Sequence, residues 1–277
     1  DGRGVQIVPP FDAEIAAAIE AAPPADEVPM SDDLIEAVDP REEYVACASA
    51  LASGEASARE DLRIVLTAMH GVGAAITSRV LAEAGFSNVS LVEAQAQPDP
   101  DFPTVPFPNP EEAGALDMAI EQAREQGADL IIAVDPDADR CALAVPDPTS
   151  ETGWSPLSGD QIGSLLGEFL AERGMTGSLA NSIVSSRLLS RIARAHGLEH
   201  HTTLTGFKWI ARAPGLGFGY EEAIGFCPDP AHVRDKDGIA TSVVAASLVA
   251  ALKAQGRSVW DELERLARLH GLHVSSP

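Results

Sequence analysis

The strongest constraint on the fold of this chain is an apolar run, Leu130 to Val134, that leads directly into three aspartates. Five consecutive aliphatic residues are typical of a parallel strand whose sheet is covered on both faces. Asp135, Asp137 and Asp139 then place three carboxylates within five residues at the carboxyl end of this strand. Like charges at this spacing repel and raise each other's pKa unless they share a cation. The stretch therefore predicts a buried strand that ends in a cation site.

The ligand atoms indicate which cation this loop would hold. Carboxylate oxygens without a neighbouring His or Cys favour Mg²⁺, with Mn²⁺ or Ca²⁺ as alternatives, and they disfavour Zn²⁺. An EF-hand fits less well, because its loop needs Gly at the sixth position and Glu at the twelfth, where this chain has Arg140 and Pro146. Arg140 adds a planar guanidinium that suits phosphate oxygens. The pattern indicates a site for a phosphorylated group beside a metal, and the alternative is a solvated acidic turn.

Strands and helices alternate along most of the sequence. Apolar runs at 62–67, 89–92 and 179–184 predict strands, and the segments between them predict helices that cross over between parallel strands. A chain of 277 residues exceeds the usual size of one domain, about 100 to 200 residues. We therefore expect an α/β protein of two consecutive domains, at 56–148 and 149–277, with mixed, mostly parallel sheets flanked by helices.

Four local features are expected outside this alternation. Residues 5–8 predict a short strand, which two prolines end. Asp12 predicts the N-cap of the helix that follows. Residues 54–61 are interpreted as a linker. After a proline-rich crossing, Asn109 and Pro110 are expected to open a helix that runs to about Glu125.

Composition excludes some classes of partner. The net charge of −23 disfavours nucleic acid and anionic membrane surfaces, because no basic stripe offsets phosphate repulsion. Three scattered cysteines indicate buried thiols in a reducing compartment rather than disulfides. The longest apolar run, near 239–252, is too short for a membrane span of about 20 residues. We expect a cytoplasmic protein with no membrane or nucleic-acid partner, whose oligomeric state stays open.

Four segments in order resemble the α-D-phosphohexomutases, the phosphoglucomutase and phosphomannomutase family. They are DPDADR at 135–140, TGFKWI at 205–210, GYEEAIG at 219–225 and VRDKDG at 233–238. In that family a phosphoserine donates its phosphoryl group to a hexose phosphate, and the bisphosphate that forms returns the other phosphoryl group to the serine. The resemblance implies a mutase that acts between the 1 and 6 positions of a hexose phosphate. It implies hexose phosphate and hexose bisphosphate as ligands, with Mg²⁺ held by the aspartates and Arg140 steadying the transferring group.

The TGFKWI segment predicts a loop and then a short helix. Thr205 and Gly206 precede the helix, where backbone N–H groups would face an anion. Lys208 lies on the helix and would contact phosphate or move a proton, whereas the alternative is an ordinary solvated lysine. The resemblance supports the first interpretation, because similar proteins place the corresponding lysine in the cleft as a candidate general acid or base.

Adjacent carboxylates occur in the GYEEAIG segment. Glu221 and Glu222 lie between apolar stretches and glycines, so they could accept paired hydrogen bonds from neighbouring sugar hydroxyls while the glycines admit a ring. The alternative is a plain hairpin tip. Better-known relatives carry a GEESGH-like string here, and this departure leaves the preferred sugar open. It is similar to the branch that includes phosphopentomutases and a hexose bisphosphate synthase.

Three further residues are candidate substrate contacts. Arg234 and Lys236 come just before a long Ala-rich helix, where basic residues oppose the helix dipole unless an anion lies nearby. The alternative is a salt-bridged helix start. His70 lies in the AMHGVG loop at 68–73, at the same edge of the sheet as the aspartates. It could contact phosphate or carry a proton, and the alternative is a structural histidine.

Two parts that the resemblance implies do not occur in these residues. No serine loop of the TASHNP kind is present, and the sequence stops at SSP before a C-terminal phosphate-binding domain would follow. We therefore expect a fragment: residues 1–55 as the tail of a serine domain with a connector, 56–148 as a metal-binding domain and 149–277 as a sugar-recognition domain. Alone, it is expected to show no mutase turnover. A non-catalytic sugar-phosphate-binding module is an alternative, as is a haloacid-dehalogenase-like phosphatase, although the residues around Asp135 depart from the pattern of the latter.

Overall fold

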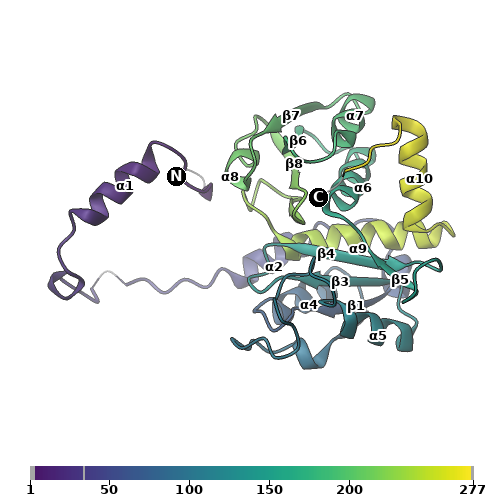
Figure 1. The fold of residues 1–277 in the computed structure, drawn as a ribbon, viewed down its shortest axis with the longest axis horizontal. Coiled ribbons are helices and arrows are strands. Elements are labelled where there is room, and N and C mark those ends of the chain that lie inside the picture. The colour runs from purple at the N-terminus through teal and green to yellow at the C-terminus, as the bar shows by residue number, and fades with distance from the viewer. Residues whose placement is uncertain (1–3, 34, 276–277) are drawn as a thin grey trace.

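The computed structural model describes residues 4–33 and 35–275. It contains two sheets, each covered by helices, with the long helix α9 (Gly238–Ala254) lying between them (Figure 1). Both sheets mix parallel and antiparallel pairs. The predicted fold class, two α/β units with mixed sheets flanked by helices, is confirmed.

The first sheet has the strand order β2-β1-β3-β4-β5. β1 pairs in parallel with β2 and β3, whereas β3–β4 and β4–β5 are antiparallel. Helices α4 and α5 pack on it. The bounds are β1 Arg63–Thr67, α4 Ala74–Glu83, β2 Asn88–Leu91, α5 Asp117–Gln126, β3 Leu130–Val134, β4 Cys141–Pro146 and β5 Trp154–Pro156, with a short 3₁₀ helix η3 at Glu93–Gln95. All five residues of β3 are buried, as its aliphatic run predicts.

The second sheet has the strand order β7-β6-β8-β9. β6 pairs in parallel with β7 and β8, and β8–β9 is an antiparallel hairpin. The bounds are α6 Gly159–Glu172, β6 Ser178–Ser182, α7 Leu188–Ala195, β7 Glu199–Thr203, α8 Phe207–Ile210, β8 Leu216–Glu221, β9 Gly225–Cys227 and α10 Val259–His270. Both sheets thus place an antiparallel hairpin beside a parallel pair.

Helix α9 belongs to the packing of both sheets. It contacts α3, α4 and β3 on one side and α6 and β9 on the other. Its Ala, Val, Ser and Thr residues are buried around almost the whole circumference, because only small side chains let neighbouring elements approach on every face. In the part of the chain that the structure describes, no one helix is long and apolar enough to cross a membrane, and α9 passes such a test only together with α10, at a bend of 92°.

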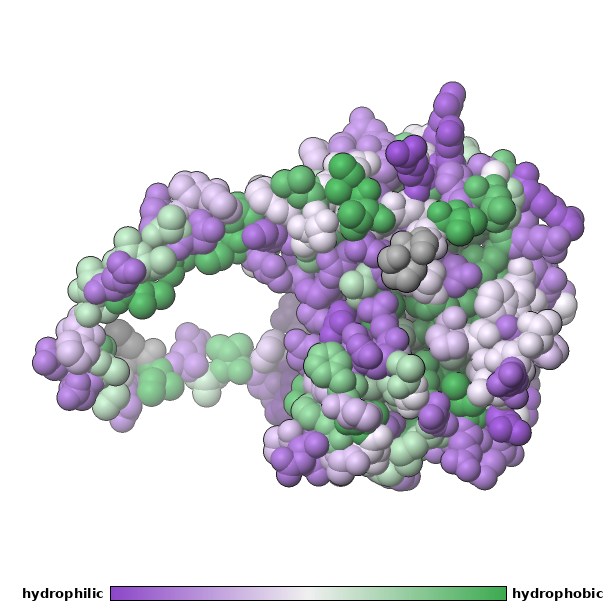
Figure 2. Space-filling view, in the orientation of Figure 1, coloured by the Kyte–Doolittle hydropathy of each residue, from purple (hydrophilic) through white to green (hydrophobic). Residues whose placement is uncertain are grey.

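The N-terminal residues form an arm that stands clear of the two sheets (Figures 1 and 2). The arm carries α1 (Phe11–Glu20) and the 3₁₀ helix η2 (Ala25–Glu27), and it joins the body at α2 (Arg41–Ser49). No residue of α1 is buried, and three of its apolar side chains are exposed, namely Phe11, Ile15 and Ile19. Before the arm, Val5 is buried against α8, and the Gln6 side chain donates to Asp235 at 2.8 Å.

Four local predictions were wrong. Residues 5–8 form no strand, since none of them pairs with another strand in the described part of the chain. Asp12 lies inside the first turn of α1, and Pro10 is the N-cap. Residues 56–61 form the helix α3 rather than a linker, because they are good helix formers that dock on α9. The helix expected from Asn109 begins only at Asp117, after turns that include Gly114 at φ +82°.

One strand changes sheet relative to the expectation. The expected boundary between residues 148 and 149 places Trp154–Pro156 in the second domain. The structure pairs this strand, β5, with β4 of the first sheet, for instance Val145 opposite Ser155. The chain therefore passes to the second sheet after β5, at the start of α6.

Candidate metal and sugar-phosphate site

The loop between β3 and β4, residues 135–140, is called the metal loop here. Oxygen atoms of Asp135, Asp137 and Asp139 all lie within 4.8 Å of one another, although the first is buried and the second is exposed. Ala138 adopts a left-handed φ of +62°, which curls the loop so that the three carboxylates converge. The loop after β1 contacts the metal loop, since the Val72 N–H donates to the Pro136 carbonyl at 2.8 Å.

Two basic side chains bind the first and the third aspartate of the metal loop. Arg140 donates to Asp135 from its backbone N–H at 3.0 Å and from Nε at 2.7 Å. Lys236, from the segment before α9, places Nζ 2.9 Å from Asp139 Oδ2. Burial raises the pKa of Asp135, and Arg140 only partly opposes this rise. Burial also acts to lower the pKa of Lys236, but Asp139 and Asp235 outweigh it and the net shift is upward.

The third carboxylate is free to take a cation. The Asp137 side chain is exposed and makes no hydrogen bond or ion pair with any residue that the structure describes. Three carboxylates at this spacing, one of them unpaired, fit a hard divalent cation such as Mg²⁺, which takes oxygen ligands and retains waters. The chemistry of the donors therefore agrees with the predicted metal site.

The turn between β8 and β9, residues 221–224, is called the glutamate turn. Glu222 is held by hydroxyls, because Ser182 and Ser185 both direct Oγ to its Oε2, at 2.8 and 2.7 Å. Both serines are buried at the carboxyl end of β6. Glu221 is partly exposed, and burial raises its pKa while the charge of Lys236 opposes that rise. Glu222 is thus fixed in place, and Glu221 is the less constrained carboxylate of the pair.

The metal loop and the glutamate turn are joined by backbone hydrogen bonds. The Cys141 N–H donates to the Ile224 carbonyl at 3.1 Å, and the Gly238 N–H donates to the Ala138 carbonyl at 3.1 Å. Arg140 and Gly225 form an antiparallel bridge. Gly238 allows this close approach, since a Cβ there would lie 2.4 Å from the Arg140 carbonyl oxygen. The two sheets therefore present their acidic turns as one surface.

The TGFK segment lies at the same edge of the second sheet. Thr205 and Gly206 follow the carboxyl end of β7, and Gly206 has φ +108° immediately before α8. Lys208 is partly exposed and places Nζ 5.8 Å from the centre of the Trp209 ring, without an ion pair among the described residues. The structure thus puts Lys208 near the site but joins Lys236, not Lys208, to the metal loop.

Two predicted contacts have protein partners of their own. Arg234 donates to the Ala211 carbonyl at 2.8 Å and lines a cavity of about 850 Å³ with Gly177 and Gly215, at the amino ends of β6 and β8. This is the opposite edge of the sheet from the glutamate turn, so the structure does not bring Arg234 to the site. The His70 ring is buried, with Nε2 2.8 Å from Thr104 Oγ1, which agrees with the structural alternative.

The sequence reasoning missed several residues that shape the site. Ser182 and Ser185 lie 40 and 37 residues before Glu222, and no short motif links them. Glu111 was not singled out either. Desolvation raises its pKa, while Arg140 lowers it and Glu222 raises it, so Glu111 lies within electrostatic range of both acidic turns. It also lines a cavity of about 380 Å³ with Ile224 of the glutamate turn.

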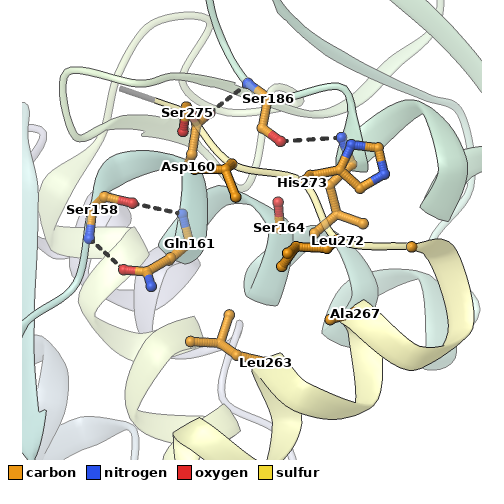
Figure 3. Close-up of a pocket in the computed structure, with 13 residues that line it drawn as sticks. Ser158, Asp160, Gln161, Ser164, Ser186, Leu263, Ala267, Leu272, His273 and Ser275 are labelled. Atoms are coloured by element: carbon orange, nitrogen blue, oxygen red, sulfur yellow. Dashed lines mark hydrogen bonds between the residues drawn. The ribbon is translucent and has the colours of Figure 1, made fainter. Parts of the chain in front are cut away.

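A separate cavity of about 440 Å³ lies between α6, α7, α10 and the residues after α10 (Figure 3). Several of its polar groups bond to their own neighbours, whereas the buried Ser164 hydroxyl has no partner among the described residues. Ser158 and Gln161 form a capping box, and Asp160 accepts from the Ser186 N–H at 2.6 Å and from Tyr220 at 2.9 Å. It contains none of the predicted site residues, so it is distinct from the two acidic turns.

Family models match both units of the chain. Residues 42–149 match the model described as phosphoglucomutase/phosphomannomutase, alpha/beta/alpha domain II, and residues 158–269 match domain III of the same family. The chain belongs to the phosphoglucomutase/phosphomannomutase family. The resemblance seen in the sequence is therefore confirmed.

Individual relatives agree with this family. A protein of Haemophilus influenzae named "Probable phosphomannomutase" is 45% identical over 280 aligned residues, which cover 98% of this chain and 56% of that protein. A phosphoglucomutase of Staphylococcus aureus is 37% identical over 227 residues, covering 78% of this chain and 40% of its own length. The chain thus spans about half the length of the curated relatives that it matches.

Solved structures share the fold. The crystal structure of a candidate phosphomannomutase from Thermus thermophilus has a TM-score of 0.76 at 26% identity, covering 94% of this chain and 57% of its own. An N-acetylphosphoglucosamine mutase of Aspergillus fumigatus, solved with GlcNAc-6P and magnesium, has a TM-score of 0.56 at 14% identity over 89% of this chain and 52% of its own. At that identity the second likeness shows the fold alone.

Proposed function

We propose that this chain is the metal-binding and sugar-recognition part of a phosphosugar mutase. The reaction would move a phosphoryl group between the 1 and 6 positions of a hexose phosphate, through a phosphoserine and a bisphosphate intermediate. The observation that carries the proposal is the backbone junction between the metal loop and the glutamate turn, in a chain of the phosphoglucomutase/phosphomannomutase family. A site for a phosphoryl group and a site for a sugar then lie side by side.

In this proposal the metal loop serves the transferring phosphoryl group. Asp135, Asp137 and Asp139 would hold Mg²⁺, which supplies neutralisation of the charge on that group. Arg140 follows the last aspartate and is bridged to Gly225, the first residue of β9 after the glutamate turn. Its guanidinium, already oriented by Asp135, would steady the phosphoryl group from the side of the sugar.

The second sheet would recognise and orient the sugar. Glu221 would accept hydrogen bonds from sugar hydroxyls, and Glu222, whose Oε2 is taken by two serines, would use its other oxygen or hold the turn in shape. Backbone N–H groups at Thr205 and Gly206 would face a phosphate, and Lys208 would assist proton transfer at a sugar hydroxyl. The position of Lys208 at this edge supports that role more than its contacts do.

A binding experiment tests the proposal on the chain itself. Calorimetric titration with Mg²⁺, and then with glucose 1-phosphate or mannose 1-phosphate, should show binding of the metal and of at least one sugar phosphate. Ribose 5-phosphate tests the pentose alternative, which the GYEEAIG string leaves open. A chain that binds Mg²⁺ but none of these sugar phosphates would contradict sugar recognition.

An assay of turnover separates binding from catalysis. The 277 residues contain no serine followed by His-Asn-Pro, so we expect this chain to bind sugar phosphate without converting glucose 1-phosphate to glucose 6-phosphate. Turnover by the purified chain would contradict the proposed phosphoserine route. Binding without turnover would also be the behaviour of a sugar-phosphate-binding module, the non-catalytic alternative.

A further inference from the structure

The Lys236 side chain lies close to the metal loop, to Asp235 and to the start of α8. Its Nζ lies 2.9 Å from Asp139 Oδ2 in the metal loop and 3.3 Å from Asp235 Oδ1. The same ammonium lies 5.6 Å from the centre of the Phe207 ring, the first residue of α8 after Thr205 and Gly206. Only 13% of the side chain is exposed. Lys236 is therefore a packed side chain with a defined path, unlike a surface lysine that samples many rotamers.

The path of Lys236 runs alongside Glu221. A Cβ at Gly225 would meet Lys236 Cδ at 2.7 Å and Glu221 Oε1 at 2.8 Å, so the two side chains flank the same glycine. The glycine leaves room for both of them. The positive charge of Lys236 opposes the rise in the Glu221 pKa, as expected of close neighbours. One ammonium thus serves a candidate metal ligand and a candidate sugar contact.

These contacts link the two proposed binding events through the charge of one lysine. Asp139 holds Lys236 through Oδ2, and a divalent cation bound at Asp139 would share the charge of that carboxylate and weaken its hold on the ammonium. The ammonium could then turn toward anionic oxygens of a ligand seated beside Glu221. Building on the proposed function, we propose that Lys236 couples cation binding at the metal loop to sugar-phosphate binding at the glutamate turn.

The coupling is measured as a ratio of affinities. The Kd of glucose 1-phosphate for the 277-residue chain is determined by calorimetry in saturating Mg²⁺ and again with the chelator EDTA, and mannose 1-phosphate serves as a second probe. The wild-type ratio should lie within the range of coupled sites, about 5- to 150-fold tighter with the metal. By reciprocity, sugar phosphate should tighten Mg²⁺ binding by the same factor.

Substitution of the lysine should remove most of this coupling. Lys236→Met should bring the ratio close to one, whatever its effect on either affinity alone. Lys253→Met is the matched control, since it removes the same charge from another ion-paired lysine, whose partners Asp61 and Asp129 lie at the amino ends of β1 and β3, away from the metal loop. It should keep the wild-type ratio.

The possible outcomes separate the two proposals. A ratio of one in the wild-type chain, or an unchanged ratio in Lys236→Met, would overturn the role of Lys236, because direct attraction between metal and phosphate would then account for any coupling. Absence of sugar-phosphate binding in the wild-type chain would instead overturn the proposed function, and the inference with it.

A second measurement needs no substitution and so avoids any effect on folding. Amine-reactive labelling of the wild-type chain, read by mass spectrometry, reports how accessible each lysine is. Mg²⁺ should weaken the ion pair between Lys236 and Asp139, so the labelling rate of Lys236 should rise. The labelling rate of Lys208 should stay unchanged. An identical Lys236 rate with and without Mg²⁺ would count against this weakening.

Discussion

The metal loop and the glutamate turn occupy equivalent places in their two sheets, yet they satisfy their carboxylates with different partners. Each follows a strand of a parallel pair and leads into an antiparallel neighbour. In the metal loop, cationic side chains of Arg140 and Lys236 hold the aspartates. In the glutamate turn, neutral hydroxyls of Ser182 and Ser185 hold Glu222.

This difference indicates what each turn can bind. Clustered charges that need cations are typical of a site for a divalent ion, and a carboxylate already accepting from hydroxyls is suited to the hydroxyls of a sugar. Topology alone therefore does not decide the ligand. The residues that bind each carboxylate decide the ligand, and substitutions at these carboxylates and at the junction test this rule.

The largest effect is expected from Asp137→Asn. Asp137 is the aspartate without a partner among the described residues, so its charge is the one most available to a metal. Since loss of an outer-shell partner alone costs about 10- to 100-fold in metal affinity, loss of a direct ligand should cost at least about 100-fold. Calorimetry with Mg²⁺ measures this. Unchanged affinity would favour the solvated acidic turn.

The next effect is expected from Gly238→Ala, which acts on the junction between the metal loop and the start of α9. The new Cβ would lie 2.4 Å from the Arg140 carbonyl oxygen and 2.7 Å from that of Ala138, and neither backbone atom can move freely. Overpacking should lower the free energy of unfolding by about 1–3 kcal/mol and weaken Mg²⁺ binding as the metal loop shifts.

Gly197→Ala is the control for that substitution. Its Cβ would meet nothing within 4 Å, but φ is +69°, so it carries only backbone strain of about 1–2 kcal/mol. Urea unfolding should show a loss of stability in both variants, and only Gly238→Ala should lose Mg²⁺ affinity. Equal Mg²⁺ affinity in the two would show that the junction does not shape the metal loop.

Glu222→Gln tests the hydroxyl-held turn. An amide can still accept from Ser182 and Ser185, but the hydrogen bonds lose their charge assistance, so the free energy of unfolding should fall by about 1 kcal/mol. Titrations should show weaker sugar-phosphate binding and unchanged Mg²⁺ binding. A matching loss of Mg²⁺ affinity would mean that the two turns do not divide the ligands as proposed.

The smallest effect is expected from Asp147→Asn, in a third acidic turn, between β4 and β5. Asp147 accepts from Thr149 and Ser155 within its own turn, and these bonds hold the pKa of its carboxyl below the ordinary value of 3.8. A depressed folded-state pKa contributes stability above pH 3.8 and loses it as pH falls through the lower, folded value.

Thermal melts at neutral pH and below pH 3.8 check this prediction. Asp147→Asn should melt slightly lower than wild type at neutral pH, and the difference should shrink in acid. Neither Mg²⁺ nor sugar-phosphate affinity should change, since this carboxylate is satisfied locally. A loss of Mg²⁺ affinity would mean that acidic turns affect the metal through long-range charge rather than through ligation.

The fold was predictable where the signal was local. The buried strands at 63–67 and 130–134 follow from aliphatic runs in the sequence. Residues 5–8 are mostly apolar as well, but a strand also needs the free edge of another strand to pair with, which a sequence does not reveal. The start of α5 was misplaced, because Pro110 is equally compatible with the turns that precede the helix.

The site was predictable to the same extent. Acidic residues that are close in sequence, such as Asp135 and Asp137, were found because one loop brings them together. The partners that define their chemistry were not found. Lys236 reaches Asp139, and Ser182 reaches Glu222, only through packing between distant segments. Arg234 shares a motif with Lys236, but it bonds to the Ala211 carbonyl and lines a cavity at the other edge of the sheet, and its predicted contact with substrate stays a prediction.

Under the proposed function, the hydrogen-bonded junction between the two acidic turns limits how the sugar preference can be redesigned. A graft that exchanges only Glu221 and Glu222 would leave Ile224, Gly225 and Gly238 in place and should keep the aspartates aligned. A longer segment taken from a relative must keep glycine at positions 225 and 238, because a side chain at either position would clash with its neighbours. Under the proposed function, a change of sugar preference and the geometry of the metal loop are therefore linked.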